Sequence, residues 1–66
     1  MTSYDSHTFR FFVTLRTTYA DGRVVEEGGY DIIARSEVQA LHAAYNWYCR
    51  GPFANGIINR EVISVE

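Results

Sequence analysis

Residues 9–48 read FRFFVTLRTTYADGRVVEEGGYDIIARSEVQALHAAYNWY, and this stretch decides the fold. In its first part every second residue from Phe9 to Leu15 is apolar, which predicts a strand from His7 to Thr18. Asp21-Gly22 follows, and this pair supplies the positive φ values of a tight hairpin turn. A second strand is therefore predicted over residues 23–34.

A helix and a third strand follow this hairpin. Ser36 is a good N-cap with Glu37 in the first turn, and Gly51-Pro52 stops a helix that runs to about Arg50. Asn55-Gly56 is a second turn signal before an apolar strand at residues 57–65. We expect one compact α+β domain over residues 1–66, with a three-stranded, mainly antiparallel sheet, one helix packed on one face, and the order β-β-α-β.

The pattern also predicts which side chains face the helix. Facing it we expect Tyr30, Ile32 and Ala34 from the second strand and Ile63 and Val65 from the third; Val25, Asp31, Ile33, Arg60, Val62 and Ser64 point away. The helix itself is predicted to pack through Val38, Leu41, Tyr45 and Tyr48, with Ala40, Ala44 and Trp47 alongside and Gln39, His42, Ala43, Asn46 and Arg50 on the opposite face. Gly28-Gly29 predicts a bulge, which leaves the side-chain parity before Gly28 open.

Size and composition limit the possible function classes. A 66-residue chain is near the lower size limit at which a hydrophobic core is stable without extra support. Its one cysteine, Cys49, cannot form an internal disulfide, and its two histidines show no zinc-binding spacing. We expect no metal and no cofactor, so oligomerisation or a protein partner remains as the extra support, with a homodimer favoured. Residues 1–6 are small and polar and should form a short lead-in; with no signal or membrane-spanning run, the predicted location is the cytoplasm.

Charge and chemistry argue against two classes of protein. The net charge of −2 disfavours binding to nucleic-acid phosphates, although all six basic residues are arginines. Cys49 precedes Arg50 near a helix C-terminus, where the dipole raises a thiol pKa, and His42 has no partner at a catalytic spacing. We therefore predict no catalytic residues and a protein that is not an enzyme.

The sheet face away from the helix is the predicted partner surface. Phe12 and Ile33 are large apolar residues on a face that should be polar, which suggests that something else covers it: a partner, a second copy packed sheet on sheet or edge to edge, or the N-terminal arm. The bland alternative is that scattered apolar residues are tolerated on this face. Tyr45, Trp47, Tyr48 and Phe53 form an aromatic cluster at the helix end that should complete the core, with Trp47 and Phe53 near its rim, and Trp47 beside Arg50 would make a second binding patch. The predicted partner-binding residues are Arg10, Phe12, Arg16, Ile33, Arg60, Val62, Trp47 and Arg50. The alternative is a nucleic-acid module in which Arg10, Arg16 and Arg60 surround Phe12.

The segment YDIIARSEVQA at residues 30–40, preceded by an alternating hairpin, resembles small proteins of phages and mobile elements, some anti-CRISPR proteins among them. In these proteins a strand ending in an aliphatic-x-Ala-x-Ser run leads into a helix. The resemblance covers about half of the chain and carries over no functional residue. It implies a phage-encoded, single-domain inhibitor or adaptor that binds host defence machinery and works by steric occlusion.

Overall fold

A computed structural model describes residues 7–66. Strand β1 (Phe9–Tyr19) and strand β2 (Val24–Ala34) form a long hairpin, helix α1 (Glu37–Tyr48) follows, and strand β3 (Ile57–Val65) ends the fold. The predicted order β-β-α-β and the α+β class are confirmed, whereas the predicted lead-in at residues 1–6 lies outside the described residues. No helix among residues 7–66 has both the length and the apolar character that crossing a bilayer requires.

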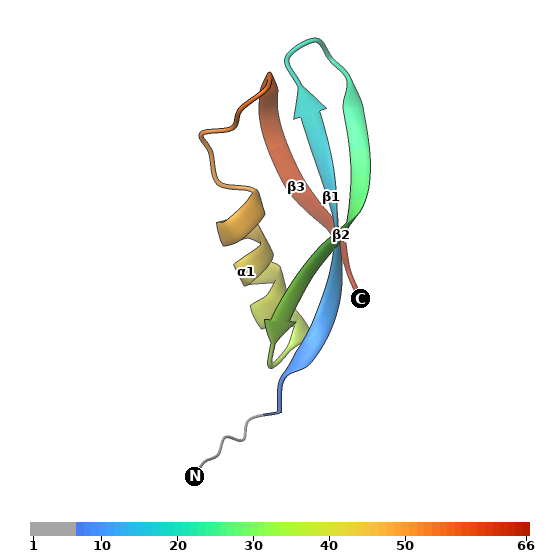
Figure 1. Cartoon of the computed structure of the whole chain (residues 1–66), viewed down its shortest axis with the longest axis vertical. Helices are drawn as coiled ribbons and strands as arrows, with labels where there is room; N and C mark the ends of the chain where they lie inside the picture. The colour runs from blue at the N-terminus through green and yellow to red at the C-terminus, as the bar shows by residue number, and fades with distance from the viewer. Residues whose placement is uncertain (1–6) are drawn as a thin grey trace.

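The sheet has β1 at its centre, with β2 and β3 antiparallel to it on either side (Figure 1). The order of the strands and the direction of β3, both of which the sequence leaves open, are thus β2-β1-β3 and antiparallel. Figure 1 shows α1 on one face of the sheet, beside its lower part, while the tip of the β1–β2 hairpin rises above the helix. We call the face under α1 the inner face and the opposite one the outer face.

Both predicted turns form. Tyr19 accepts a hydrogen bond from Gly22 N–H, the Asp21 carboxylate accepts one from Arg23 N–H, and of the Asp-Gly pair only Gly22 has a positive φ (93°). At the second turn both Asn55 (φ 59°) and Gly56 (φ 77°) are left-handed, and Ile57 N–H donates back to Ala54. The two turns place the first residues of β2 and β3, Val24 and Ile57, beside the end of β1.

Helix α1 begins with a reciprocal cap. Ser36 Oγ accepts a hydrogen bond from Gln39 N–H at 3.1 Å, and Gln39 Oε1 accepts one from Arg35 N–H at 2.7 Å. The helix ends at Tyr48, two residues earlier than predicted, with Cys49 as its C-cap. These polar side chains fix the point at which β2 stops being a strand.

The core is small and its helix side is built from alanines. The buried apolar residues are Val13, Leu15, Ile32, Ala34, Ala40 and Ala44. The predicted helix stripe is confirmed for Leu41 and Tyr48, which are half-buried, and is wrong for Val38 and Tyr45, which are exposed. Ala43, predicted on the outward side, packs against the core instead. Small side chains let the helix approach the sheet closely, so the larger ones lie at its flanks.

Three bulges set which side chains face the helix. One extra residue in β2, within Gly28-Gly29, lies opposite Thr14, which confirms the predicted bulge. In β3 the register with β1 shifts at Ile63 and again at Ile58, each of which is one residue too many. Because side chains alternate along a strand, each extra residue reverses which later side chains point inward.

Candidate protein-interaction site

The lower part of the outer face carries two exposed apolar side chains. Phe12 on β1 is 55% exposed and Ile33 on β2 is 64% exposed. Their neighbours along the strands, Val13 and Ile32, are buried on the inner face, so Phe12 and Ile33 point away from α1 as predicted. Large apolar side chains exposed on a helix-free sheet face are typical of a surface that binds something.

An ion pair lies between these two side chains. In the register of β1 with β2, Arg10 is opposite Ile33 and Phe12 is opposite Asp31. Arg10 Nε donates diagonally across the two strands to Asp31 Oδ2 at 3.0 Å. The Arg10 guanidinium carbon also lies 5.6 Å from the centre of the Phe12 ring. The patch therefore alternates apolar and paired charged groups, which gives a partner both apolar contact and a fixed pattern of polar groups.

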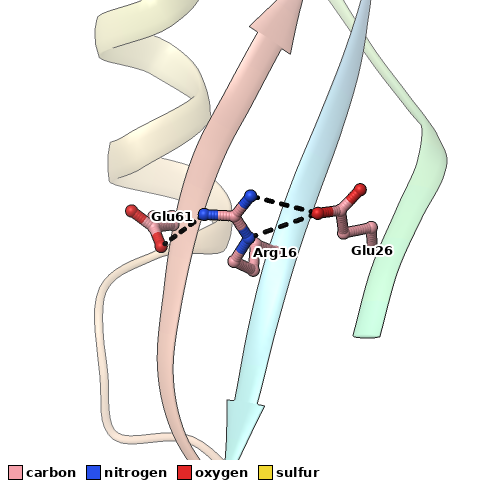
Figure 2. Close-up of polar contacts among 3 residues, drawn as sticks. All are labelled: Arg16, Glu26 and Glu61. Carbon is pink, nitrogen blue, oxygen red and sulfur yellow. Dashed lines mark hydrogen bonds and ion pairs between the residues drawn. The ribbon is translucent and has the colours of Figure 1, made fainter. Parts of the chain in front are cut away.

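Arg16, further up the same face, is paired on both sides. Its Nη2 lies 3.0 Å from Glu26 Oε2 on β2, and its Nη1 lies 3.5 Å from Glu61 Oε2 on β3 (Figure 2). The hydrogen bond to Glu26 is the main cause that raises the pKa of Arg16 above its ordinary value. Three strands are thus joined by one guanidinium, whose donors are directed sideways along the sheet and not toward a ligand.

The predicted outward position of Arg60 and Val62 is wrong. Val62 is opposite Leu15 and packs against the core, and Arg60 is opposite Thr17, whose side chain is 1% exposed. Arg60 Nε donates to Thr17 Oγ1 at 3.2 Å, and its guanidinium carbon lies 5.9 Å from the centre of the Tyr30 ring. The extra residue Ile63, which was predicted to face the helix, reverses the side-chain parity of the residues before it.

The same correction applies to Val25, on the other side of β1. Val25 is opposite Thr17 and so lies on the inner face, because the bulge at Gly28-Gly29 reverses the parity before it. Val24 is on the outer face in its place.

The three arginines of the nucleic-acid alternative do not lie on one face of the sheet. Two of its three arginines, Arg10 and Arg16, are on the outer face but are paired with the carboxylates of Asp31, Glu26 and Glu61. The third, Arg60, is on the inner face. On the outer face these two guanidinium groups are thus paired with three carboxylates, a local charge that is unfavourable for a phosphate backbone.

Trp47 and Ile33, predicted in two separate patches, line one groove. The groove has a volume of about 250 Å³, lies between α1 and the β2 edge, and is lined by Asp31, Ile32, Ile33, Ala43 and Trp47. The Trp47 side chain is 78% exposed, the largest exposed fraction among the large hydrophobic residues of the described chain. The β2 edge therefore has an exposed apolar anchor on each face, Ile33 outside and Trp47 on the helix side.

The other residues at the helix end have different roles. The Tyr48 ring packs against the Tyr30 ring at a centroid distance of 4.8 Å, and Phe53 is half-buried, as expected of aromatics that complete a core. Arg50 is exposed but is not among the residues that line the groove. Of the predicted Trp47/Arg50 patch, only Trp47 belongs to the candidate site.

The described residues include one cysteine thiol, Cys49, as a candidate nucleophile. Burial raises the pKa of the Cys49 thiol above its ordinary value, which favours the protonated form near neutral pH. Residues 7–66 contain no group of three or more His, Cys, Asp or Glu side chains that could hold a metal ion.

Two features of the site were not predicted. The ion pair of Arg10 with Asp31 depends on strand register, which a single sequence leaves open until the hairpin turn and the bulge are both placed. The position of β2 at an edge depends on β3 returning to the far side of β1. The acidic residue Asp31 in an otherwise apolar run was the one available signal, since strand interiors disfavour Asp.

Comparison with known proteins gives no relative for this architecture. No protein-family model matches the chain, and no curated protein and no solved structure matches it either.

Proposed function

We propose that this chain is a small non-catalytic interaction protein that binds a larger protein through the lower outer face. The contact residues are Phe12 and Ile33, with the Arg10–Asp31 ion pair between them. The observation that carries the proposal is the exposure of Phe12, a large aromatic side chain at the centre of the uncovered face. Aromatic and arginine side chains are also the most frequent anchors of protein interfaces.

The chemistry of the patch defines the kind of partner that it fits. Arg10 and Asp31 neutralise each other, so the patch has no excess charge, and a partner with an apolar contact surface ringed by polar groups suits it best. Binding on such a face would act by occlusion, in which the partner's own surface is covered. Inhibition of host defence by a phage-encoded protein is one function that operates in this way, and we propose it as the biological setting.

The test is capture of proteins from a lysate of the source cells by three immobilised variants. Wild type is compared with Phe12→Asp, which places a charge in the patch, and with Val38→Asp, a matched control. The Val38 side chain is 64% exposed on α1, outside the outer face, so both variants add the same charge at a similarly exposed site. Circular dichroism establishes that all three have the same helix content.

We expect wild type and Val38→Asp to retain at least one protein in similar amounts. The amount of this protein that Phe12→Asp retains should be lower by about tenfold or more. The retained protein is then purified and titrated against the same variants by calorimetry. Equal retention by all three variants would contradict the proposal that the outer face is the binding surface.

A further inference from the structure

We infer that a second copy of this chain adds to the β2 edge, which makes one continuous six-stranded antiparallel sheet about a twofold axis at Ile32. This inference concerns the backbone groups along the β2 edge, whereas the proposed function concerns side chains of the outer face; Asp31 and Ile33 belong to both, and Phe12 belongs only to the outer face. Among residues 7–66, β2 pairs only with β1, so one side of β2 has free backbone groups. Such an edge is a template for another strand.

The backbone of β1 shows which residues of β2 have those free groups. Phe12 exchanges both of its backbone hydrogen bonds with Glu66, just beyond the end of β3, at 2.7 and 2.8 Å. Backbone groups alternate in direction along a strand, so Phe11 and Val13 turn theirs toward β2, where they face Ile32 and Tyr30. It follows that the N–H and C=O groups of Asp31 and Ile33 point to the open side of β2.

One register uses all of these groups. With Ile32 opposite Ile32 of the second copy, Asp31 faces Ile33 of the second copy and Ile33 faces its Asp31. Each of the two pairs exchanges two hydrogen bonds, and no like charges are opposed. The register with Asp31 opposite Asp31 of the second copy brings two carboxylates together. The register with Ile33 opposite Ile33 of the second copy puts Asp31 opposite its Arg35. That pair would need the Arg35 N–H, which already donates to Gln39 Oε1.

The exposed Trp47 fits the same arrangement. A twofold axis perpendicular to the sheet puts both helices on one face. Because α1 contacts both β2 and β3, it lies above the central strand, and the two helices are then about three strand spacings, or ~14 Å, apart. Helices in direct contact are about 8–10 Å apart, so large side chains must fill the space between them. Trp47 and the groove between α1 and β2 lie at this place.

The opposite edge of the sheet is unsuitable for strand addition. A groove of about 360 Å³ lies between α1 and β3, lined by Glu37, Val38, Leu41, Val62, Ile63, Ser64 and Val65. However, Ile58 and Ile63 are extra residues that break the register of β3. Bulges of this kind disrupt the regular spacing of backbone groups that a partner strand requires. The segment from Tyr30 to Ala34 in β2 has no such break.

The test measures the mass in solution of wild type, Ile33→Pro and Ile33→Ala by sedimentation equilibrium over a range of concentrations. Proline at position 33 removes the N–H that points to the open side but leaves the β1 ladder intact. Alanine removes the same apolar side chain and keeps the N–H, so it is the matched control. We expect a wild-type dimer whose dissociation constant rises by about tenfold or more in Ile33→Pro, since symmetry removes two hydrogen bonds, and by much less in Ile33→Ala.

A wild-type monomer at all concentrations, or a dimer equally stable in the Ile33→Pro and Ile33→Ala variants, would overturn the inference. Amide hydrogen exchange on wild type covers the case in which Ile33→Pro does not fold. Protection of the Asp31 and Ile33 amides should rise with protein concentration, and free exchange in a dimer would contradict the β2 contact. Phe12→Asp should still dimerise, because Phe12 is on β1, so loss of partner binding and loss of the dimer are separate results.

Discussion

At the scale of single residues, Arg60 shows that an arginine on an alternating strand can belong to the interior. Its Nε donates a hydrogen bond to Thr17 Oγ1, and its guanidinium carbon lies 5.9 Å from the centre of the Tyr30 ring. Its long side chain buries the methylene stem and still reaches a hydroxyl, which a shorter residue at this position could not do. Arg60 is thus part of what holds the hairpin to β3.

We predict that Arg60→Ala lowers the free energy of unfolding by about 1 kcal/mol, because the buried Thr17 hydroxyl loses its hydrogen-bond donor. Urea denaturation followed by circular dichroism measures the change. Arg50→Ala is the control, since Arg50 is exposed, and its midpoint should equal that of wild type. Equal midpoints for Arg60→Ala and wild type would show that the Thr17 contact contributes nothing.

At the scale of elements, the bulge in β2 reverses the side-chain parity of the residues before Gly28. Gly29 has φ 92°, in the left-handed region, whereas Gly28 does not. A Cβ at Gly29 would meet no atom within 4 Å, so any cost of a side chain there comes from the backbone alone. A Cβ at Gly28 would lie at an ordinary 3.7 Å from Thr14 Oγ1.

We therefore predict opposite results for two adjacent substitutions. Gly29→Ala should destabilise the protein by about 1–2 kcal/mol, because a side chain disfavours the left-handed conformation. Gly28→Ala should be neutral or slightly stabilising, because it reduces the freedom of the unfolded chain. Thermal denaturation of both variants distinguishes them, and an equal loss in both would mean that the strain is not local to Gly29.

The same bulges explain how far the sequence predicts this fold. Strand alternation, two glycine turns and the Ser36 cap were sufficient for all four elements, and β3 was predicted with its observed ends. The faces of Arg60, Val62 and Val25 were not predictable in the same way. A bulge at Ile63 has no glycine to signal it, and one extra residue reverses every assignment beyond it. The faces of Phe12 and Ile33 were predicted correctly, because the register of β1 with β2 is continuous from Phe9 opposite Ala34 to Val13 opposite Tyr30.

At the scale of the whole molecule, two titratable groups lie on the inner face near the end of α1. Burial is the main cause that raises the pKa of both Cys49 and Tyr30 above their ordinary values of 9.0 and 10.0. A group with a raised pKa contributes its full stability below the unfolded value and loses it as the pH rises. Stability should therefore be constant up to about pH 9 and decline above it.

The predicted decline is modest, because both side chains are only partly buried. Urea midpoints between pH 7 and pH 11 measure it, and Cys49→Ala should remove the part of the decline that begins near pH 9. A stability that rises over this range would have the wrong sign for burial as the cause.

The two edges of the sheet differ, and this difference limits growth. A sheet with two regular edges can add copies without end and become a fibre. Here β2 is regular from Tyr30 to Ala34, whereas β3 is interrupted twice. Once two β2 edges have met, both outer borders of the assembly are β3 strands, which offer no continuous template to a third chain. The irregularities of β3 would thus allow the protein to accumulate at high concentration in a cell without polymerising.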